Sequence, residues 1–321
     1  MHCESCSRSG KWKPSRYGSY IYIVPLALLL TSLALSGCDL AVSVVIAPEI
    51  LTVCPSGCDY TSIQEAIAAA SPYQVIEVQT GGYRESLLIA ELLILKGAGA
   101  DVTAITGGSK DYPTITIIAG EVVISGFSIT GEHHGIKVEG NADVTIRDCQ
   151  ITGNALAGVI GQDRAQIRLE GSDISGNEWG IFAKDHSSFT AIGGNILFNR
   201  CEGILLWEAA ELTLMGVDVS FNGGGGIWAS DYTWLILENC VVDFNRADGV
   251  LLAGHVTAHL EENRIAGNEG WGVAAYEWPC HMTKESFSGT ASGRDNQILD
   301  WWEENGNERG APCGVPWWLK D

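Results

Sequence analysis

A repeat of about 23 residues limits how this chain can fold more than any other feature of its sequence. A Gly followed by Ile or Val recurs at steps of 22 or 23 residues, and an Asn recurs with the same period from Asn154 to Asn268. The Gly of each pair is Gly135, Gly158, Gly180, Gly203, Gly226, Gly249 or Gly272. Two aliphatic columns are in phase with these pairs, namely Ile146, Leu169, Ile192, Leu214, Leu237 and Leu260, and Ile151, Ile174, Leu197, Val219, Val242 and Ile265. Each repeat therefore predicts three short strands of alternating residues, separated by Gly, Asn or Asp.

Short strands of this kind cannot bury an apolar face alone, so the repeats have to stack. If the chain coils so that each strand lies about 4.8 Å from its equivalent in the next turn, backbone groups pair between turns and like side chains stack. An Asn at one corner can then form a ladder of side-chain amides. A helical solenoid would need helix-length apolar stripes, which the sequence lacks. The pattern therefore predicts an all-β fold, a right-handed single-stranded parallel β-helix with three strands per turn.

The ends of the repeat region carry features expected of caps, which protect the open strand edges of a solenoid. Residues 53–275 are assigned to the β-helix, and residues 276–321 to a Trp-rich cap or tail because the repeat stops after about Tyr276. The segment Thr61-Ser62-Ile63-Gln64 is a capping box, and Glu65–Ala70 is Ala-rich, so we expect a short capping helix that plugs the first turn. Less regular strands are predicted at Val75–Val78, Leu87–Ile89 and Leu92–Leu95.

The amino end predicts export. Four basic residues precede an apolar stretch from Tyr20 to Leu35, which is too short to span a bilayer comfortably, and Leu35-Ser36-Gly37-Cys38 follows. This tetrapeptide resembles the lipobox of bacterial lipoproteins. The resemblance implies a signal peptide over residues 1–37, lipidation of Cys38, an anchor linker over 38–52, and attachment to the bacterial cell membrane facing the periplasm or the exterior.

The chain is strongly acidic, with a formal net charge of −20. Removal of residues 1–37 would leave 15 basic and 38 acidic residues. Such a body repels phosphate backbones, so nucleic acid is not expected as a partner. The charge also argues against polyanionic sugars unless a cation bridges them, although it can equally serve solubility.

Ten cysteines include two candidate disulfide pairs in the exported part. Cys54 with Cys58 and Cys280 with Cys313 are the expected pairs outside the cytoplasm, although sequence alone does not fix the connectivity. No Cys/His cluster has the spacing of a zinc site, so no structural metal is predicted.

Three motifs near the amino end, together with the repeats, resemble the pectin lyase-like superfamily. The segments 59–67, 75–78 and 82–85 (DYTSIQEAI, VIEV and GYRE) resemble the opening of pectin methylesterases, and the repeats over 113–275 resemble the generic parallel β-helix repeat family. The resemblance implies the fold but no single activity, since the superfamily includes lyases, hydrolases, esterases, epimerases and proteins with no known reaction. Gly161-Gln162-Asp163-Arg164 retains only a Gln-Asp pair of the methylesterase motif.

An acidic column follows the repeat four residues beyond each Ile or Val. It comprises Asp163, Asp185, Glu208, Asp231 and Glu277, and the column beside it includes Arg164, His186, Tyr232, His255 and Trp278. Acidic and aromatic side chains along one edge are suited to a sugar-binding groove, and Asp185, Glu208 and Asp231 to a Ca²⁺ site. Pairs of the first four carboxylates, with His186, are also candidates for general acid and base in glycoside chemistry. Alternatively, these turns are simply polar, and Asp is favoured for its backbone hydrogen bonds.

An apolar stripe is predicted on the outer surface, where the residue after each Ile or Val points outward. Its central members are Phe182, Leu205, Trp228 and Leu251. A stripe of this kind should be covered or used. We expect the tail, which contains Trp301, Trp302, Trp317 and Trp318, to fold over it, or a partner protein or second copy to bind it.

Three functions remain open at this stage. The favoured one is a membrane-anchored extracytoplasmic lipoprotein that binds carbohydrate or another extended polymer without catalysis and without a cofactor, apart from the Ca²⁺ option. The second is a polysaccharide lyase, hydrolase or esterase, and the third is a structural surface scaffold.

Overall fold

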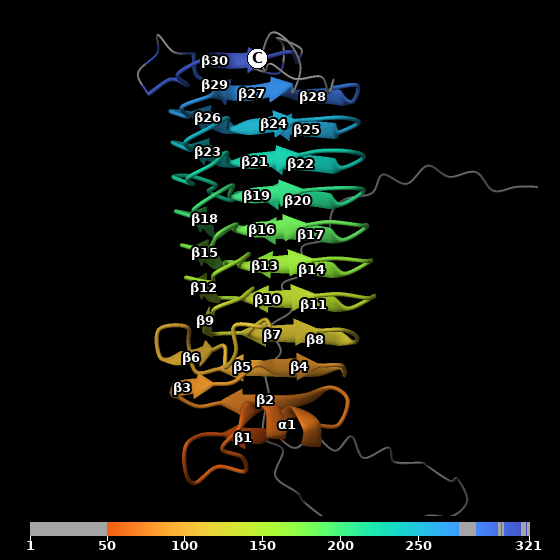
Figure 1. Cartoon of the computed structure of the whole chain (residues 1–321), viewed down its shortest axis with the longest axis vertical. Coiled ribbons are helices and arrows are strands. Elements are labelled where there is room, and N and C mark those ends of the chain that lie inside the picture. Colours follow the sequence, from red (N-terminus) through yellow and green to blue (C-terminus); the bar gives the residue numbers. More distant parts are fainter. Residues whose placement is uncertain (1–49, 276–286, 301–302, 304, 316–318, 320–321) are drawn as a thin grey trace, which may run out of the picture. The chain divides into compact units, whose positions relative to one another are not determined.

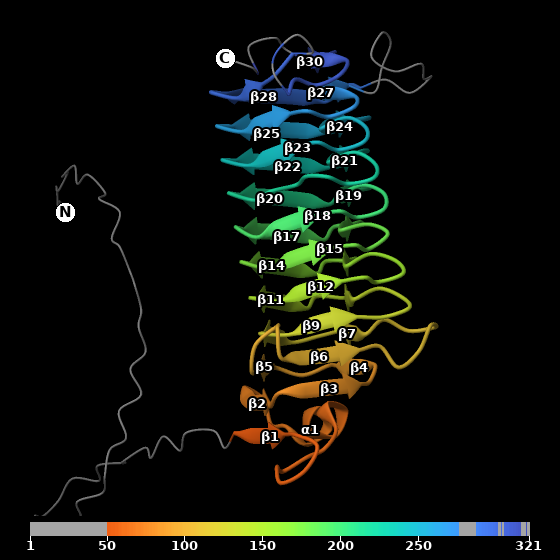
Figure 2. The ribbon, with the colours of Figure 1, turned by 90° about the vertical axis from the view of Figure 1, so that its left-hand side faces the viewer.

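Short parallel strands lie one above another along a single axis and form a coil with three strands per turn (Figures 1 and 2). The structure is a computed structural model that describes residues 50–275, 287–300, 303, 305–315 and 319, all within one unit, Ala47–Asp321. The predicted parallel β-helix is confirmed. In each regular turn the chain passes through a strand of sheet C, then sheet A, then sheet B, as defined by the strands below.

Each sheet is built from equivalent strands of successive turns, and all of the pairs are parallel. Sheet A contains β1 (Leu51–Val53), β2 (Gln74–Val78), β5 (Leu93–Gly97), β8 (Glu121–Ser125), β11 (Asp143–Arg147), β14 (Gln166–Glu170), β17 (Ser188–Ile192), β20 (Glu211–Met215), β22 (Trp234–Glu238), β25 (Thr257–Glu261) and β28 (Thr290–Arg294). Sheet C contains β4 (Leu87–Ile89), β7 (Ile115–Ile117), β10 (Ile136–Val138), β13 (Val159–Gly161), β16 (Ile181–Ala183), β19 (Ile204–Leu206), β21 (Ile227–Ala229), β24 (Val250–Leu252), β27 (Trp271–Ala275) and β30 (Gly310–Cys313).

Sheet B is divided into two parts that isolated bridges at Asp218 connect. Its first part contains β3 (Gly81–Arg84), β6 (Thr103–Thr106), β9 (Ser128–Thr130), β12 (Gln150–Thr152), β15 (Asp173–Ser175) and β18 (Asn195–Leu197). Its second part contains β23 (Val241–Asp243), β26 (Arg264–Ala266) and β29 (Gln297–Ile298).

Aliphatic side chains from alternate strand positions fill the inside of the coil, as the columns predict. The predicted columns are wrong at two members, because Ala191 stacks on Leu169 and Ile196 stacks on Ile174. Ile192 and Leu197 lie one position further on and are only half-buried. The turn is one residue shorter here, and a shift of one residue sends a strand side chain to the opposite face.

The predicted Asn ladder is confirmed at the corner between sheets B and C. Each Asn side chain donates its Nδ2 hydrogen to the Oδ1 atom of the next Asn, over 2.8–3.1 Å, and that same Oδ1 accepts the backbone N–H. The ladder consists of Asn154, Asn177, Asn199, Asn222, Asn245, Asn268 and Asn307, all of them buried. The backbone bends away from both sheets at this corner, and the Asn side chains accept its N–H groups. The ladder therefore stabilises the bent conformation in every turn.

Helix α1 (Ile63–Ala69) closes the first turn and packs Ile63, Ala66 and Ile67 inward, as expected of a cap (Figure 2). Its N-cap is Ser62, whose Oγ accepts the N–H of Glu65 at 3.3 Å. The Glu85 carboxylate, which the sequence did not indicate, accepts the N–H groups of Ile63 and Gln64.

The coil continues beyond the expected boundary at residue 275, because β28, β29 and β30 add one more strand to each sheet. Their sequences lack the aliphatic repeat, so the period alone did not reveal them. Leu319 is buried at this end, and its carbonyl oxygen accepts a hydrogen bond from Asn296 Nδ2. The four tail Trp residues lie outside the described residues.

The expected disulfide between Cys54 and Cys58 is confirmed. Cys313 is also disulfide-bonded, while Cys280, its expected partner, lies outside the described residues, as do residues 1–49 with Cys38. In the part of the chain that the structure describes, no helix has the length and apolar character needed to cross a membrane.

Candidate functional site

The predicted acidic column lies in the turns from sheet C to sheet A and holds successive turns of the coil together. Asp163, Asp185, Glu208 and Asp231 all have positive φ angles, between 58° and 64°. Asp185 Oδ2 accepts the backbone N–H of Asp163 at 3.0 Å, and Glu208 Oε2 accepts that of Asp185 at 3.0 Å. The same contact joins Asp231 to Glu208 and Asp163 to Gly140. The carboxylates therefore satisfy backbone groups that a left-handed turn leaves outside the sheets.

These contacts also determine whether the carboxylates can transfer protons or bind a metal ion. The backbone N–H of Asp163 lowers the pKa of Asp185, so this carboxyl stays ionised at neutral pH and is poorly suited to act as a general acid. Among the described residues, no group of three or more His, Cys, Asp or Glu side chains could hold a metal ion. Asp185, Glu208 and Asp231, where calcium was expected, do not form such a group, because their carboxylates bond to backbone groups of successive turns.

The other predicted edge residues that the structure describes are open to solvent. Arg164 and His186 line a shallow hollow of about 400 Å³ beside the column. Two turns further on, the rings of Tyr232 and His255 stack with centroids 4.8 Å apart. Glu277 and Trp278 lie outside the described residues. The edge thus brings its side chains into a row rather than into one deep groove.

A groove of about 600 Å³ lies over the outer face of sheet C, beside this edge. The loop between β6 and β7 contributes Asp111 and Tyr112, and the loop between β9 and β10 contributes His133 and His134. The floor and the opposite rim consist of strand residues and the turns after them, namely Lys137, Ile160, Gln162, Phe182, Lys184, Trp207 and Glu208. Of the predicted catalytic candidates, Glu208 alone lines this groove.

Aromatic rings give the groove its apolar surface. Phe182 and Trp207 meet edge to face with centroids 5.3 Å apart, and the Trp179 ring is tilted against Phe182 with centroids 6.3 Å apart. Trp207 is 43% exposed and Tyr112 is 67% exposed, so both present ring surface to solvent. Exposed rings beside hydrogen-bonding groups are the usual means by which a protein binds an amphipathic ligand.

The two histidines supply neutral polar groups at the groove wall. His134 Nδ1 accepts the N–H of Ala157 at 3.1 Å, and burial lowers the pKa of His134 to about 4. The ring is therefore neutral at pH 7 and carries its hydrogen on Nε2. Burial also lowers the pKa of His133, whose buried Nδ1 has no hydrogen-bond partner among the described residues. The Nε2–H group of His134 is thus left to donate a hydrogen bond to a ligand hydroxyl.

The predicted apolar stripe is not an open surface. Leu205 is buried, and the other three members are half-buried between the flanking loops. Phe182 forms part of the groove, while Trp228 and Leu251 line a smaller hollow of about 190 Å³ with Glu202 and Asp248. A partner on this stripe stays a prediction.

Sequence reasoning missed an exposed stack of three phenylalanines. Phe198, Phe221 and Phe244 lie parallel at 5.3 and 5.2 Å, each with a positive φ, at the turn before the Asn ladder. A Phe-Asn pair that recurs at 23-residue steps could have revealed them. Because Phe221 lies between the other two rings, its faces contact protein, whereas Phe198 at the end of the stack is 61% exposed.

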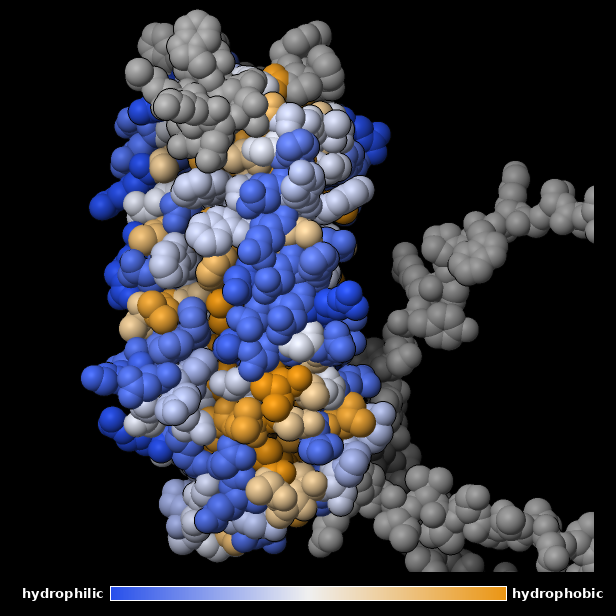
Figure 3. All heavy atoms as spheres, turned by 45° about the vertical axis from the view of Figure 1, so that its right-hand side comes forward, coloured by the Kyte–Doolittle hydropathy of each residue, from blue (hydrophilic) through white to orange (hydrophobic). Residues whose placement is uncertain are grey.

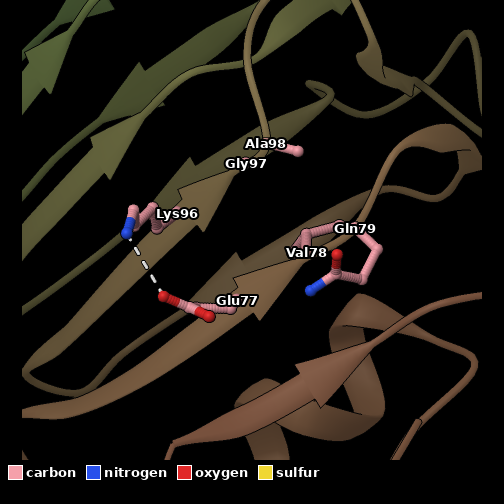
Figure 4. A pocket seen from close by; sticks show the side chains of 6 residues that line it. All are labelled: Glu77, Val78, Gln79, Lys96, Gly97 and Ala98. Carbon is pink, nitrogen blue, oxygen red and sulfur yellow. Dashed lines mark hydrogen bonds and ion pairs between the residues drawn. The ribbon is translucent and has the colours of Figure 1, made fainter.

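Two other surfaces are poorer candidates. Between β2 and β5, a hollow of about 290 Å³ contains the Lys96–Glu77 ion pair at 3.2 Å and no aromatic side chain (Figure 4). Apolar surface also gathers near the first turns of the coil, below a mostly polar region (Figure 3). Leu88 of β4 and Ile118, which follows the neighbouring strand β7, are exposed.

Comparison with known proteins identifies the class. The family described as right-handed β-helix region matches residues 119–287, more than half of the chain. The chain therefore belongs to the right-handed β-helix family.

Solved structures with a similar fold include the ORF18 protein of Geobacillus virus E2, with a TM-score of 0.53 and 14% identity over 73% of this chain and 56% of that chain. Carrot pectin methylesterase gives 0.51 and 12% over 78% and 84%, and an alginate lyase from Paenibacillus sp. gives 0.50 and 16% over 78% and 95%. At these identities the likeness shows the fold alone.

A sequence relative is a cell surface glycoprotein of Methanothermus fervidus, which is 36% identical over 99 residues. The match covers 30% of this chain and 16% of that protein's length.

Proposed function

We propose that this protein is an extracytoplasmic β-helix protein that binds saccharide chains in the groove over sheet C without cleaving them. The observation that carries the proposal is the composition of the groove, in which Phe182, Trp207 and Tyr112 lie beside hydrogen-bonding side chains. Sugar rings have apolar faces that stack on aromatic rings and hydroxyls that pair with imidazole, amide and carboxylate groups. The acidic edge lends catalysis little support, because its carboxylates lie in a row and bond to the backbone.

Export and lipid anchoring at Cys38 belong to the same proposal. The basic amino end, the apolar stretch and the small-small-Cys exit support both, and the surface location in the name of the Methanothermus fervidus relative supports export alone. Labelling of cells with a radioactive or clickable fatty acid tests the anchor. Wild-type protein should incorporate the label, and Cys38→Ser should not.

A glycan array and affinity electrophoresis of the purified protein test the binding function. Trp207→Ala should weaken retention of the bound glycan by about fivefold, because an exposed ring contact contributes on the order of 1 kcal/mol. Trp234→Ala is a matched control, since Trp234 is 57% exposed on sheet A and lies outside the groove. Equal retention by the two variants would place binding elsewhere, and no retention by the wild type would favour the scaffold function.

A polysaccharide-active enzyme is the second candidate, because Glu208 and His134 line the same groove. New reducing ends, unsaturated products or released ester groups would support it. The change Glu208→Gln should then abolish turnover while leaving far-UV circular dichroism unchanged.

A further inference from the structure

We infer that the groove over sheet C selects uncharged saccharide chains and disfavours polyanionic ones. The inference rests on the proposed saccharide-binding function and adds the class of ligand. Three observations carry it: the balance of charges that line the groove, the partners of its two lysines, and the charge of the surrounding body.

The charged side chains that line the groove cancel. Lys137 and Lys184 contribute two positive charges, and Asp111 and Glu208 contribute two negative charges. His133 and His134 are neutral at pH 7, since burial lowers both pKa values. None of the described lining residues is Arg, the side chain best suited to paired recognition of carboxylates and sulfates.

Both lysines already have carboxylate partners. Lys137 Nζ lies 2.6 Å from Glu139 Oε2, and Lys184 Nζ lies 3.7 Å from Asp185 Oδ2. An acidic sugar would have to compete with these carboxylates for the ammonium groups. Once the two partners are counted, the groove and its immediate surroundings carry more negative than positive charge.

The rest of the chain adds to this repulsion, because its net charge is −20. A polyanionic glycan therefore approaches a like-charged body and meets no unpaired cation among the described residues of the groove. An uncharged glycan avoids this cost and keeps every ring and hydroxyl contact.

Titration calorimetry with the full chain tests the inference on linear hexasaccharides of equal length. The neutral probes are cellohexaose, xylohexaose and mannohexaose, and the acidic probes are hexagalacturonate and hexaguluronate. We expect the best neutral hexamer to bind at least about tenfold more tightly than either acidic one at low salt. Raising salt from about 0.01 M to about 1 M shortens the Debye length from about 30 Å to about 3 Å, so it should strengthen acidic binding and leave neutral binding unchanged.

A charge variant tests the cause. Glu139→Gln leaves Lys137 without its carboxylate partner and should strengthen acidic-hexamer binding on the order of three- to tenfold at low salt, with no change for neutral hexamers. Glu170→Gln is the control, because it releases Arg147 and Arg168 on the outer face of sheet A, away from the groove.

The outcomes separate the two proposals. Equal or tighter binding of an acidic hexamer overturns the inference and leaves the saccharide-binding function standing, and an unchanged preference in Glu139→Gln also overturns the inference. Binding of none of the probes overturns both.

Discussion

Replacement of one central Asn of the ladder by Ala should lower the free energy of unfolding more than the loss of so small a side chain suggests. The Asn222 side chain takes part in four hydrogen bonds of 3.0 or 3.1 Å, with the backbone N–H and side chain of Asn199, the carbonyl of Ile196 and the side chain of Asn245. In Asn222→Ala the buried N–H of Asn199 loses its acceptor. An unsatisfied buried group costs about 1–3 kcal/mol, and each further lost bond costs about 0.5–1.5 kcal/mol unless water replaces it. We therefore expect a loss of about 3 kcal/mol in the free energy of unfolding.

Urea unfolding followed by far-UV circular dichroism measures this loss. With a slope of about 3 kcal/mol per molar, the midpoint should fall by about 1 M while the slope stays constant. Asn195→Ala is the control, because the half-buried Asn195 donates one bond, to Asp173 at 2.6 Å, and should cost about 1 kcal/mol or less. A loss under about 1 kcal/mol for Asn222→Ala, or equal losses in the two variants, would refute the view that buried amide pairing holds this corner.

Three further predictions concern the turns and the core. The pKa of Asp185 is lower in the folded state than in the unfolded chain. Its ionised carboxylate therefore stabilises the fold above the pKa of an unfolded Asp, about 3.9, and this stabilisation is lost as pH falls through the folded-state pKa. In acid titrations of the free energy of unfolding, Asp185→Asn should remove this pH-dependent part. Phe221→Gly should change stability by less than about 1 kcal/mol, because relief of the positive φ offsets the lost ring stacking, whereas Phe221→Val should be clearly destabilising in thermal melts. The Cys149 thiol, whose pKa burial raises to about 11, should resist alkylation at about pH 8 until urea unfolds the coil, and rapid labelling of the native chain would contradict its buried position.

The fold could be predicted from the sequence because the residues that form the strands and those that form the corners recur with the same period. The Gly-Ile/Val pairs and the Asn column mark the same positions in each turn, and stacking makes like residues meet. A fixed period assigned the wrong residues to the aliphatic columns at Ile192 and Leu197, where the turn is one residue shorter. It also missed the strands beyond residue 275, where an insertion precedes β28. Asn296 and Asn307 continue the inner contacts there, at separations of 33 and 39 residues that a search at a fixed period does not find.

The candidate site was predicted less well, for a physical reason. The acidic residues were found because they repeat, but a residue that repeats in every turn performs a task that every turn shares. Asp163, Asp185 and Glu208 perform such a task, since each accepts a backbone N–H from the turn before. The groove also needs side chains that occur once, such as Tyr112 and His133, beside the column members Phe182 and Glu208. Their positions depend on irregular loops, which no periodicity describes.

In a stacked fold, residues that repeat in every turn tend to be structural, and residues that occur once are better candidates for a functional site. A column of like residues is explained when its contacts run from each turn to the next, as in the Asn ladder, the acidic turns and the Phe stack. A group of unlike residues whose contacts leave surface and hydrogen-bonding capacity free is not explained by stacking. The groove over sheet C is such a group, because the rings of Tyr112 and Trp207 remain open to solvent beside polar side chains such as Gln162. Function in this protein should therefore be sought first where the repeat is broken, and single substitutions there should alter binding while leaving the coil intact.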